Sequence, residues 1–162
     1  MAAEDQVRMF DNFSMPGLTS VQVSTGYLEA AGQVYLSGAP LIDSGAGVLQ
    51  TAADDVTTPI IVGFATYAAS GVTDNETSVT PALSGLEFEA TLESSSPGDH
   101  ALAQTDLFAK YGFEVNGSNL WYVNQAETAS PAVVVIALID PIGTVQGRVR
   151  VRLLNRVCLG NL

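Results

Sequence analysis

The 162-residue sequence contains one cysteine, Cys158, so no disulfide can form within the chain. The fold must therefore depend on burial of apolar side chains and on backbone hydrogen bonds. A chain of this length can bury a core without cross-links, and it fits one domain with an additional arm or tail.

Charged residues are also scarce. They make up 14% of the sequence, against about 25% in typical soluble domains, while hydrophobic residues make up 47%. The single lysine is Lys110. Two explanations fit this composition equally well. The surface is covered with Ser, Thr, Asn and Gln, or part of it is covered by other chains, since Lys and Glu are depleted in the cores of interfaces.

Basic residues are nearly absent from the first two thirds of the chain. Residues 1–109 contain fourteen acids and one base, Arg8, for a net charge of −13, and residues 110–162 contain three acids and five bases, for a net charge of +2. The formal net charge of −11 repels phosphate groups. We therefore expect no direct binding of nucleic acid.

Motifs of the common enzyme families are missing. The sequence has no G-x-S-x-G nucleophile elbow, Walker loop, dinucleotide-binding fingerprint or H-E-x-x-H zinc pair. The one histidine, His100, follows Asp99 and is either a solvated loop residue or a general base. We favour the first interpretation, assign no catalytic, cofactor-binding or metal-binding residue, and expect a protein that is not an enzyme.

Acidic and aromatic pairs provide weaker candidates. Glu87 and Glu89 share one face of a strand, which is typical of a solvated surface rather than of a glycosidase pair. Asp54-Asp55 and Asp74-Asn75-Glu76 lack the spacing of a calcium loop, which favours solvated acids. Trp121-Tyr122 point to opposite faces of a strand, so one belongs to the core and the other is a candidate sugar platform or packing residue.

No apolar run is long enough for a membrane helix; the longest, 132–139, suits a buried strand. The acidic start of the chain is unlike a signal peptide. We therefore expect no membrane partner and synthesis in the cytoplasm.

Alternating apolar and polar residues predict an all-β fold, a small barrel or sandwich. About eight strands are expected, with a hairpin turn at 116–119, a bulge or a close backbone approach at Gly63, a loop over 68–85 and at most one short helix over 101–111. In the strand over 86–93, the glutamates Glu87, Glu89 and Glu93 are expected to face outward. The strands lie over 21–25, 32–36, 41–42, 60–66, 86–93, 113–115 with 120–123, 132–139, and 148–154.

Residues 1–20 lack a clean period and end near a Pro16-Gly17 turn signal, so we divide the chain into an N-terminal arm (1–20) and a β domain (21–162). The arm carries four large apolar side chains that are costly to leave in water. We expect them to lie on the β domain or on a neighbouring chain; they are Met9, Phe10, Phe13 and Met15.

Arg148, Arg150 and Arg152 alternate with apolar residues and therefore share one face of a strand. Three adjacent arginines repel one another, so acidic groups are expected to cover them. The cover is a neighbouring strand, for instance through Glu87 and Glu89, or an acidic patch on another subunit.

Together these segments resemble the head decoration (cement) proteins of tailed bacteriophages. The segments that carry the resemblance are Gly32-Gln33-Val34-Tyr35-Leu36, Ile61-Val62-Gly63-Phe64-Ala65, Leu86-Glu87-Phe88-Glu89, Leu120-Trp121-Tyr122-Val123 and Gly147-Arg148-Val149-Arg150-Val151.

The resemblance implies a structural virion protein that stabilises the capsid by binding the lattice of the major capsid protein. It also implies a homotrimer on the capsid surface, with a terminal arm that clasps the shell and without catalytic residues. The candidate interface residues are then Met9, Phe10, Phe13, Met15, Arg148, Arg150 and Arg152. The alternative is a carbohydrate-binding β module of a phage tail or fibre.

Overall fold

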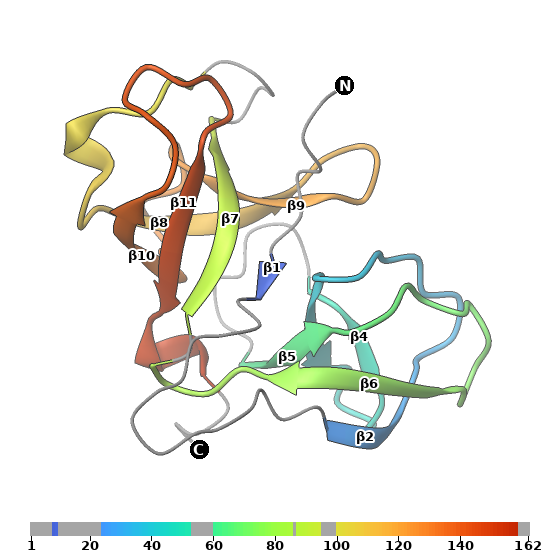
Figure 1. Cartoon of the computed structure of the whole chain (residues 1–162). Helices are drawn as coiled ribbons and strands as arrows, with labels where there is room; N and C mark the ends of the chain where they lie inside the picture. Colours follow the sequence, from blue (N-terminus) through green and yellow to red (C-terminus); the bar gives the residue numbers. More distant parts are fainter. Residues whose placement is uncertain (1–7, 10–23, 53–59, 86, 95–99, 159–162) are drawn as a thin grey trace.

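The computed structural model describes residues 8–9, 24–52, 60–85, 87–94 and 100–158, and within them the chain consists mainly of β-strands (Figure 1). Eleven strands and two 3-10 turns occur in these ranges. The strands form two sheets, one of which closes into a barrel. The expected all-β fold with a small barrel is confirmed.

The second half of the chain forms the barrel. Its strand order is β7-β11-β10-β8-β9, and a parallel pairing of β9 with β7 closes the ring, with Leu92 opposite Val123. Closure removes the free sheet edges that would otherwise offer unpaired backbone groups. The strands are β7 (Glu87–Glu93), β8 (Lys110–Val115), β9 (Trp121–Asn124), β10 (Val133–Leu138) and β11 (Arg148–Leu153).

A short N-terminal strand, β1 (Arg8–Met9), adds to the same edge of β7 that β9 uses further along. It runs antiparallel, with Arg8 opposite Glu89 and Met9 opposite Phe88. This part of the expected arm therefore lies on the chain's own β domain. Phe10, Phe13 and Met15 lie outside the described residues.

The first half of the chain forms a five-stranded sheet in the order β2-β6-β5-β3-β4. A parallel bridge from Glu29, just after β2, to Leu49 in β4 connects the two ends of this sheet. Its strands are β2 (Ser24–Leu28), β3 (Pro40–Asp43), β4 (Leu49–Thr51), β5 (Ile61–Ala65) and β6 (Glu76–Pro81).

Barrel and sheet share one hydrophobic core. The ring of Phe64 in β5 packs against Phe88 in β7, with ring centroids 4.4 Å apart, and against Phe113 in β8 at 6.1 Å. All five residues of β5 are buried, as its continuous β-branched run predicts. The two sheets therefore pack against each other as parts of one domain.

The clearest turn and strand predictions are confirmed. Asn116 closes the β8–β9 hairpin by accepting hydrogen bonds from the backbone N–H groups of Ser118 and Leu120. A register shift lies next to Gly63, between the pairs Leu41–Gly63 and Ile42–Ile61. The backbone also approaches closely there, because a Cβ added at Gly63 would lie 2.5 Å from the Thr80 carbonyl oxygen. Both findings follow from turn and glycine chemistry that the sequence displays directly.

Three expectations about secondary structure are wrong. Residues 32–36 form no strand, although Tyr35 is buried in the core. Residues 68–85 are not one loop, because they contain β6. Its residues pair with β2 and β5, so tertiary pairing decides the conformation of a Ser- and Thr-rich segment.

The predicted helix over 101–111 is the third error. Only a 3-10 turn, η1 (Gln104–Asp106), forms there, and β8 already begins at Lys110. The residue before the turn, Ala103, provides no side-chain cap. A second 3-10 turn, η2 (Asn155–Val157), follows β11. The limit of one short helix holds, because neither turn is an α-helix.

Candidate functional site

The arginine face predicted on β11 is present in the structure. Val149, Val151 and Leu153 are buried, and the three arginines alternate with them on the outer face of the barrel. Figure 1 shows β11 beside β7 along the length of the barrel. The side chains that can cover the arginines therefore come from β7 and from the loop that precedes β11.

The covering groups come from the chain itself. In the β7–β11 register, Arg152 lies opposite Glu87 and Arg150 lies opposite Glu89. An Nη2 atom of Arg152 is 2.7 Å from Oε1 of Glu87. On the other side of β7, Glu89 also lies opposite Arg8. The cross-strand explanation is thus confirmed for Arg152 by an ion pair, while for Arg150 the register places Glu89 opposite it. On its other edge β7 pairs with β1, which contains Arg8.

The remaining arginine is paired in a different way. Arg148 donates hydrogen bonds from Nε and Nη2 to the two carboxylate oxygens of Asp140, at 3.1 and 2.9 Å. Its backbone N–H also donates to Asp140, at 2.8 Å. These hydrogen bonds hold the pKa of Asp140 below its usual value and raise the pKa of Arg148.

Two of the three glutamates in β7 do not face solvent as predicted. Glu87 is buried and forms an ion pair with Arg152, and Glu93 is buried at the end of the strand, where Gln146 donates a hydrogen bond to it at 3.3 Å. Only Glu89 retains partial exposure. Alternation along a strand predicts which side chains face solvent only where nothing else packs on the outside of that strand. Here long polar side chains pack on the outside of β7.

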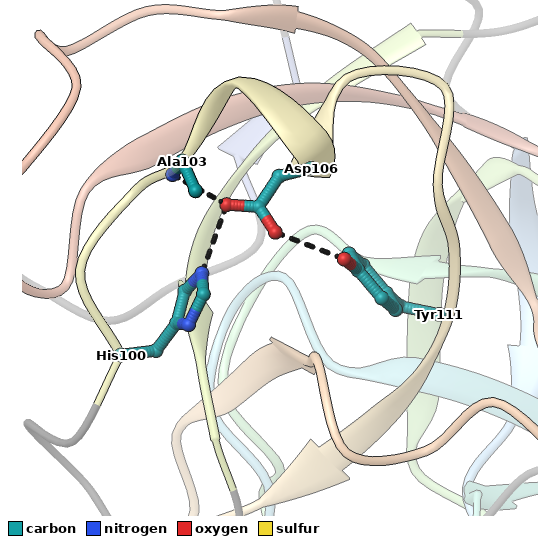
Figure 2. A network of polar contacts seen from close by, with 4 residues as sticks. All are labelled: His100, Ala103, Asp106 and Tyr111. Carbon is teal, nitrogen blue, oxygen red and sulfur yellow. Dashed lines mark hydrogen bonds and ion pairs between the residues drawn. The ribbon is translucent and has the colours of Figure 1, made fainter.

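A second polar cluster lies in the segment that leads into β8 (Figure 2). The buried carboxylate of Asp106 accepts a hydrogen bond from the backbone N–H of Ala103 at 2.8 Å and one from the Tyr111 hydroxyl at 2.9 Å. His100 Nε2 lies 2.9 Å from the same carboxylate. Burial, together with the hydrogen bond to Asp106, raises the pKa of Tyr111 above its usual value.

The hydrogen bonds of this cluster hold the segment before β8 in place. The side chain of His100 is only 12% exposed, so the expectation of a solvated loop histidine is wrong. Its ring nitrogen points at Asp106, and the suggested partner Asp99 lies outside the described residues. The sequence reasoning did not identify Asp106 or Tyr111, because their approach depends on a 3-10 turn that no local pattern announces.

The other candidate aromatic and thiol groups are buried. Trp121 is 3% exposed and Tyr122 is 1% exposed, so neither forms the surface platform that a sugar-binding role for this pair requires. Burial raises the pKa of the Cys158 thiol, whose sulfur donates to the Leu154 carbonyl oxygen. A buried thiol with a raised pKa is a poor nucleophile.

A hollow of about 320 Å³ lies on the first sheet and was not foreseen from the sequence. At its base, the buried carboxylate of Glu29 accepts hydrogen bonds from the backbone N–H groups of Ser70 and Gly71, at 3.0 and 2.8 Å. The Tyr67 side chain at its rim is 70% exposed. The lining residues are Thr25, Glu29, Tyr67, Ala68, Ser70, Asn75, Glu76, Thr77 and Ser78.

Large apolar side chains are exposed on the parts of the chain that the structure describes. Three lie on two segments, 33–36 and 67–72, that a hydrogen bond from Ala69 to Tyr35 holds together. Others lie in the β10–β11 loop and on the turn before β8. The exposed residues are Leu28, Val34, Tyr67, Val72, Leu83, Phe108, Ile142 and Val145.

Within the described ranges, no group of three acidic, histidine or cysteine residues is arranged to hold a metal ion. Asp74, Asn75 and Glu76 are exposed, and Asp54 and Asp55 lie outside those ranges. The same part of the chain contains no helix that is long and apolar enough to cross a membrane.

No model of a known protein family matches the chain, and a comparison with curated proteins found no relative.

Proposed function

We propose that this chain is a structural virion protein that decorates a bacteriophage capsid and stabilises it by binding the lattice of the major capsid protein. It acts as a homotrimer on the capsid surface and has no catalytic role. A protein that binds only the assembled lattice favours that lattice by mass action.

The character of the surface carries this proposal. Charged residues are already scarce, and the fold buries four of the acids, Glu29, Glu87, Glu93 and Asp106. Eight large hydrophobic side chains remain exposed in the described residues. A surface that is poor in charge and carries exposed apolar side chains is suited to being covered by partners in an assembly.

The N-terminal segment is the first of the proposed contacts with the shell. β1 adds to the edge of β7 through two residue pairs, so the chain uses this edge for strand addition. Met9, Phe10, Phe13 and Met15 are proposed to make the contact with the shell. Arg148, Arg150 and Arg152 are proposed as outer contacts, although each lies against or opposite an acid of its own chain.

The carbohydrate-binding alternative lacks its proposed aromatic platform, because the side chains of Trp121 and Tyr122 are both buried.

The experiment that tests the proposal is reconstitution. Shells assembled from the major capsid protein of the same phage are incubated with the purified chain, sedimented, and heated in parallel with undecorated shells. We expect saturable binding at a fixed ratio to the capsid protein and a higher disruption temperature. A chain that stays in the supernatant at every concentration would rule out the decoration role.

A further inference from the structure

Phe108 has an unusual backbone conformation and an unusual exposure. Its φ angle is +68°, in the left-handed region that bulky side chains rarely adopt. The other non-glycine residues with positive φ in the described chain are Asp74, Asn119 and Gln146, which are polar. The Phe108 side chain is 70% exposed. Strained residues of this kind are concentrated at functional sites.

The turn that presents Phe108 is held firmly on both sides. The Phe108 N–H donates to the Val135 carbonyl oxygen at 2.9 Å, and the Val135 N–H donates to Ala109 at 2.9 Å. The Ala109 N–H donates to the backbone of Asp106, whose side chain is fixed by the cluster in Figure 2. The backbone that presents the ring is held by these hydrogen bonds and so loses little conformational freedom when the ring binds, which suits an anchor residue.

We propose that Phe108 inserts into the hollow beside Tyr67 on a second copy of this chain. The hollow is near the lower end of the volumes of small-molecule sites, which begin at about 300 Å³, and so accommodates one aromatic side chain. Its buried carboxylate, Glu29, already accepts two backbone N–H groups. An apolar ring therefore leaves that carboxylate with its hydrogen bonds.

The local charges of the two surfaces are complementary, which favours a second copy as the occupant. The segment 24–82, which builds the sheet with the hollow, contains no Lys, Arg or His and six acids: Glu29, Asp43, Asp54, Asp55, Asp74 and Glu76. Lys110, the only lysine, is exposed two residues after Phe108, and Glu76 is exposed at the hollow. Insertion of Phe108 thus brings the Lys110 ammonium group close to the acidic edge of the hollow. Such a pair of opposite charges steers the encounter of the two copies and fixes their relative orientation.

The contact cannot form within one chain. Figure 1 shows the 100–109 segment, in yellow, on the far side of the barrel from the 66–76 segment, in green, on the other sheet. Because the two surfaces differ, the contact is head-to-tail and generates a ring if its rotation closes. This contact deepens the assembly role proposed above by naming the surfaces through which copies of the chain meet.

The test uses the purified full-length chain without shells, so its outcome is independent of capsid binding. Light scattering over a concentration series is expected to show a mass that rises above that of one chain. Phe108→Gly removes the ring and relieves the positive φ, so it should weaken self-association by about tenfold or more while the melting temperature stays equal or rises. Ile142→Ser, which removes another exposed apolar side chain, is the matched control and should associate normally.

Charge exchange makes the test specific for the two surfaces. Lys110→Glu and Glu76→Lys should each weaken association, and the double variant should restore part of it. A wild-type chain that stays monomeric throughout the series would overturn the proposal, as would Phe108→Gly associating like the wild type. Single charge variants whose effects simply add in the double variant would exclude Glu76 as the partner of Lys110.

Discussion

Arg152 and Glu87 form an ion pair across β7 and β11, with 2.7 Å between Nη2 and Oε1, in which the two partners differ greatly in exposure. The arginine side chain is 49% exposed and the glutamate side chain is 6% exposed. The pair therefore lies at the boundary between solvent and core. The contribution of this ion pair to the free energy of unfolding depends mainly on the buried Glu87 carboxylate, because a charge that is removed from water requires a partner.

Arg152→Ala should lower the free energy of unfolding by about 1–3 kcal/mol, because it leaves the Glu87 carboxylate buried without its guanidinium. The measurement is the urea-unfolding midpoint. The matched control is Arg148→Ala on the same strand, whose partner Asp140 is 23% exposed and can be solvated. That change should cost only about 0–1 kcal/mol.

The double variant Arg152→Ala with Glu87→Gln should recover part of the loss, because a neutral amide is less costly to bury than an unpaired carboxylate. Equal losses for Arg152→Ala and Arg148→Ala would show that burial of Glu87 does not matter for the strength of this pair.

The sequence predicts the arginine face well and its partners only in part. Alternation alone places Arg148, Arg150 and Arg152 together, because side chains in a strand alternate in direction. It cannot fix the register with β7, which depends on contacts distant in the chain. Glu87 and Glu89 could therefore be named as candidates, whereas Asp140 could not.

The regions that sequence reasoning missed share a physical cause. The polarity of the Ser and Thr residues in β6 suggests a loop. They nevertheless form a regular strand, because this segment pairs with both β2 and β5. The Asp106 cluster and the hollow at Tyr67 depend on the geometry of turns and on contacts between segments far apart in the chain. Local patterns contain little information about such contacts, because tertiary packing overrides propensity.

Alkaline pH should destabilise the protein from about pH 10 upward, where an unfolded tyrosine ionises. Burial raises the pKa of both Tyr111 and Tyr35 in the folded protein above 10.0. Because the pKa of these tyrosines is higher in the folded state, the unfolded state loses the tyrosine proton first as the pH rises. The tyrosines therefore make their full contribution to stability below about pH 10, and this contribution falls at higher pH. The slope is about 1.4 kcal/mol per pH unit for each such tyrosine.

Tyr111→Phe should remove one of these contributions and flatten the alkaline slope of the free energy of unfolding. At neutral pH the variant should be less stable than the wild type, because Asp106 loses a hydrogen bond. Urea unfolding monitored by circular dichroism from about pH 8 to about pH 11, a range that includes the tyrosine pKa, measures both effects. Tyr67→Phe, at an exposed ring, is the control, and an unchanged slope in Tyr111→Phe would contradict the assignment.

Gly63→Ala should destabilise the protein by about 1–3 kcal/mol or more, because the new methyl group has no space. Its Cβ would lie 2.5 Å from the Thr80 carbonyl oxygen and 2.8 Å from the Val79 Cβ, and a backbone carbonyl in a paired strand cannot move aside easily. Gly117→Ala, in the β8–β9 turn where no atom lies within 4 Å, should be nearly neutral. Thermal unfolding of the two variants provides the comparison, and similar melting temperatures would contradict this prediction.

Deletion of residues 2–15 should weaken binding to capsid shells and leave the β domain folded. Among the described residues, the arm contributes only the two pairs of β1 with β7, so its removal costs little backbone hydrogen bonding. Co-sedimentation with shells measures binding, and circular dichroism with thermal unfolding measures the fold. Deletion also uncovers the β7 edge beside Phe88, and an open edge can cause aggregation that imitates lost binding.

A full-length variant separates these effects. Replacing Met9, Phe10, Phe13 and Met15 by serine keeps the backbone that pairs with β7 and removes the apolar side chains. If those side chains contact the shell, this variant should lose binding as the deletion does, while remaining soluble and folded. If it binds like the wild type while the deletion does not, the arm acts through its backbone at the β7 edge. Wild-type binding by both variants would exclude the arm and leave the outer face of the barrel as the surface to test.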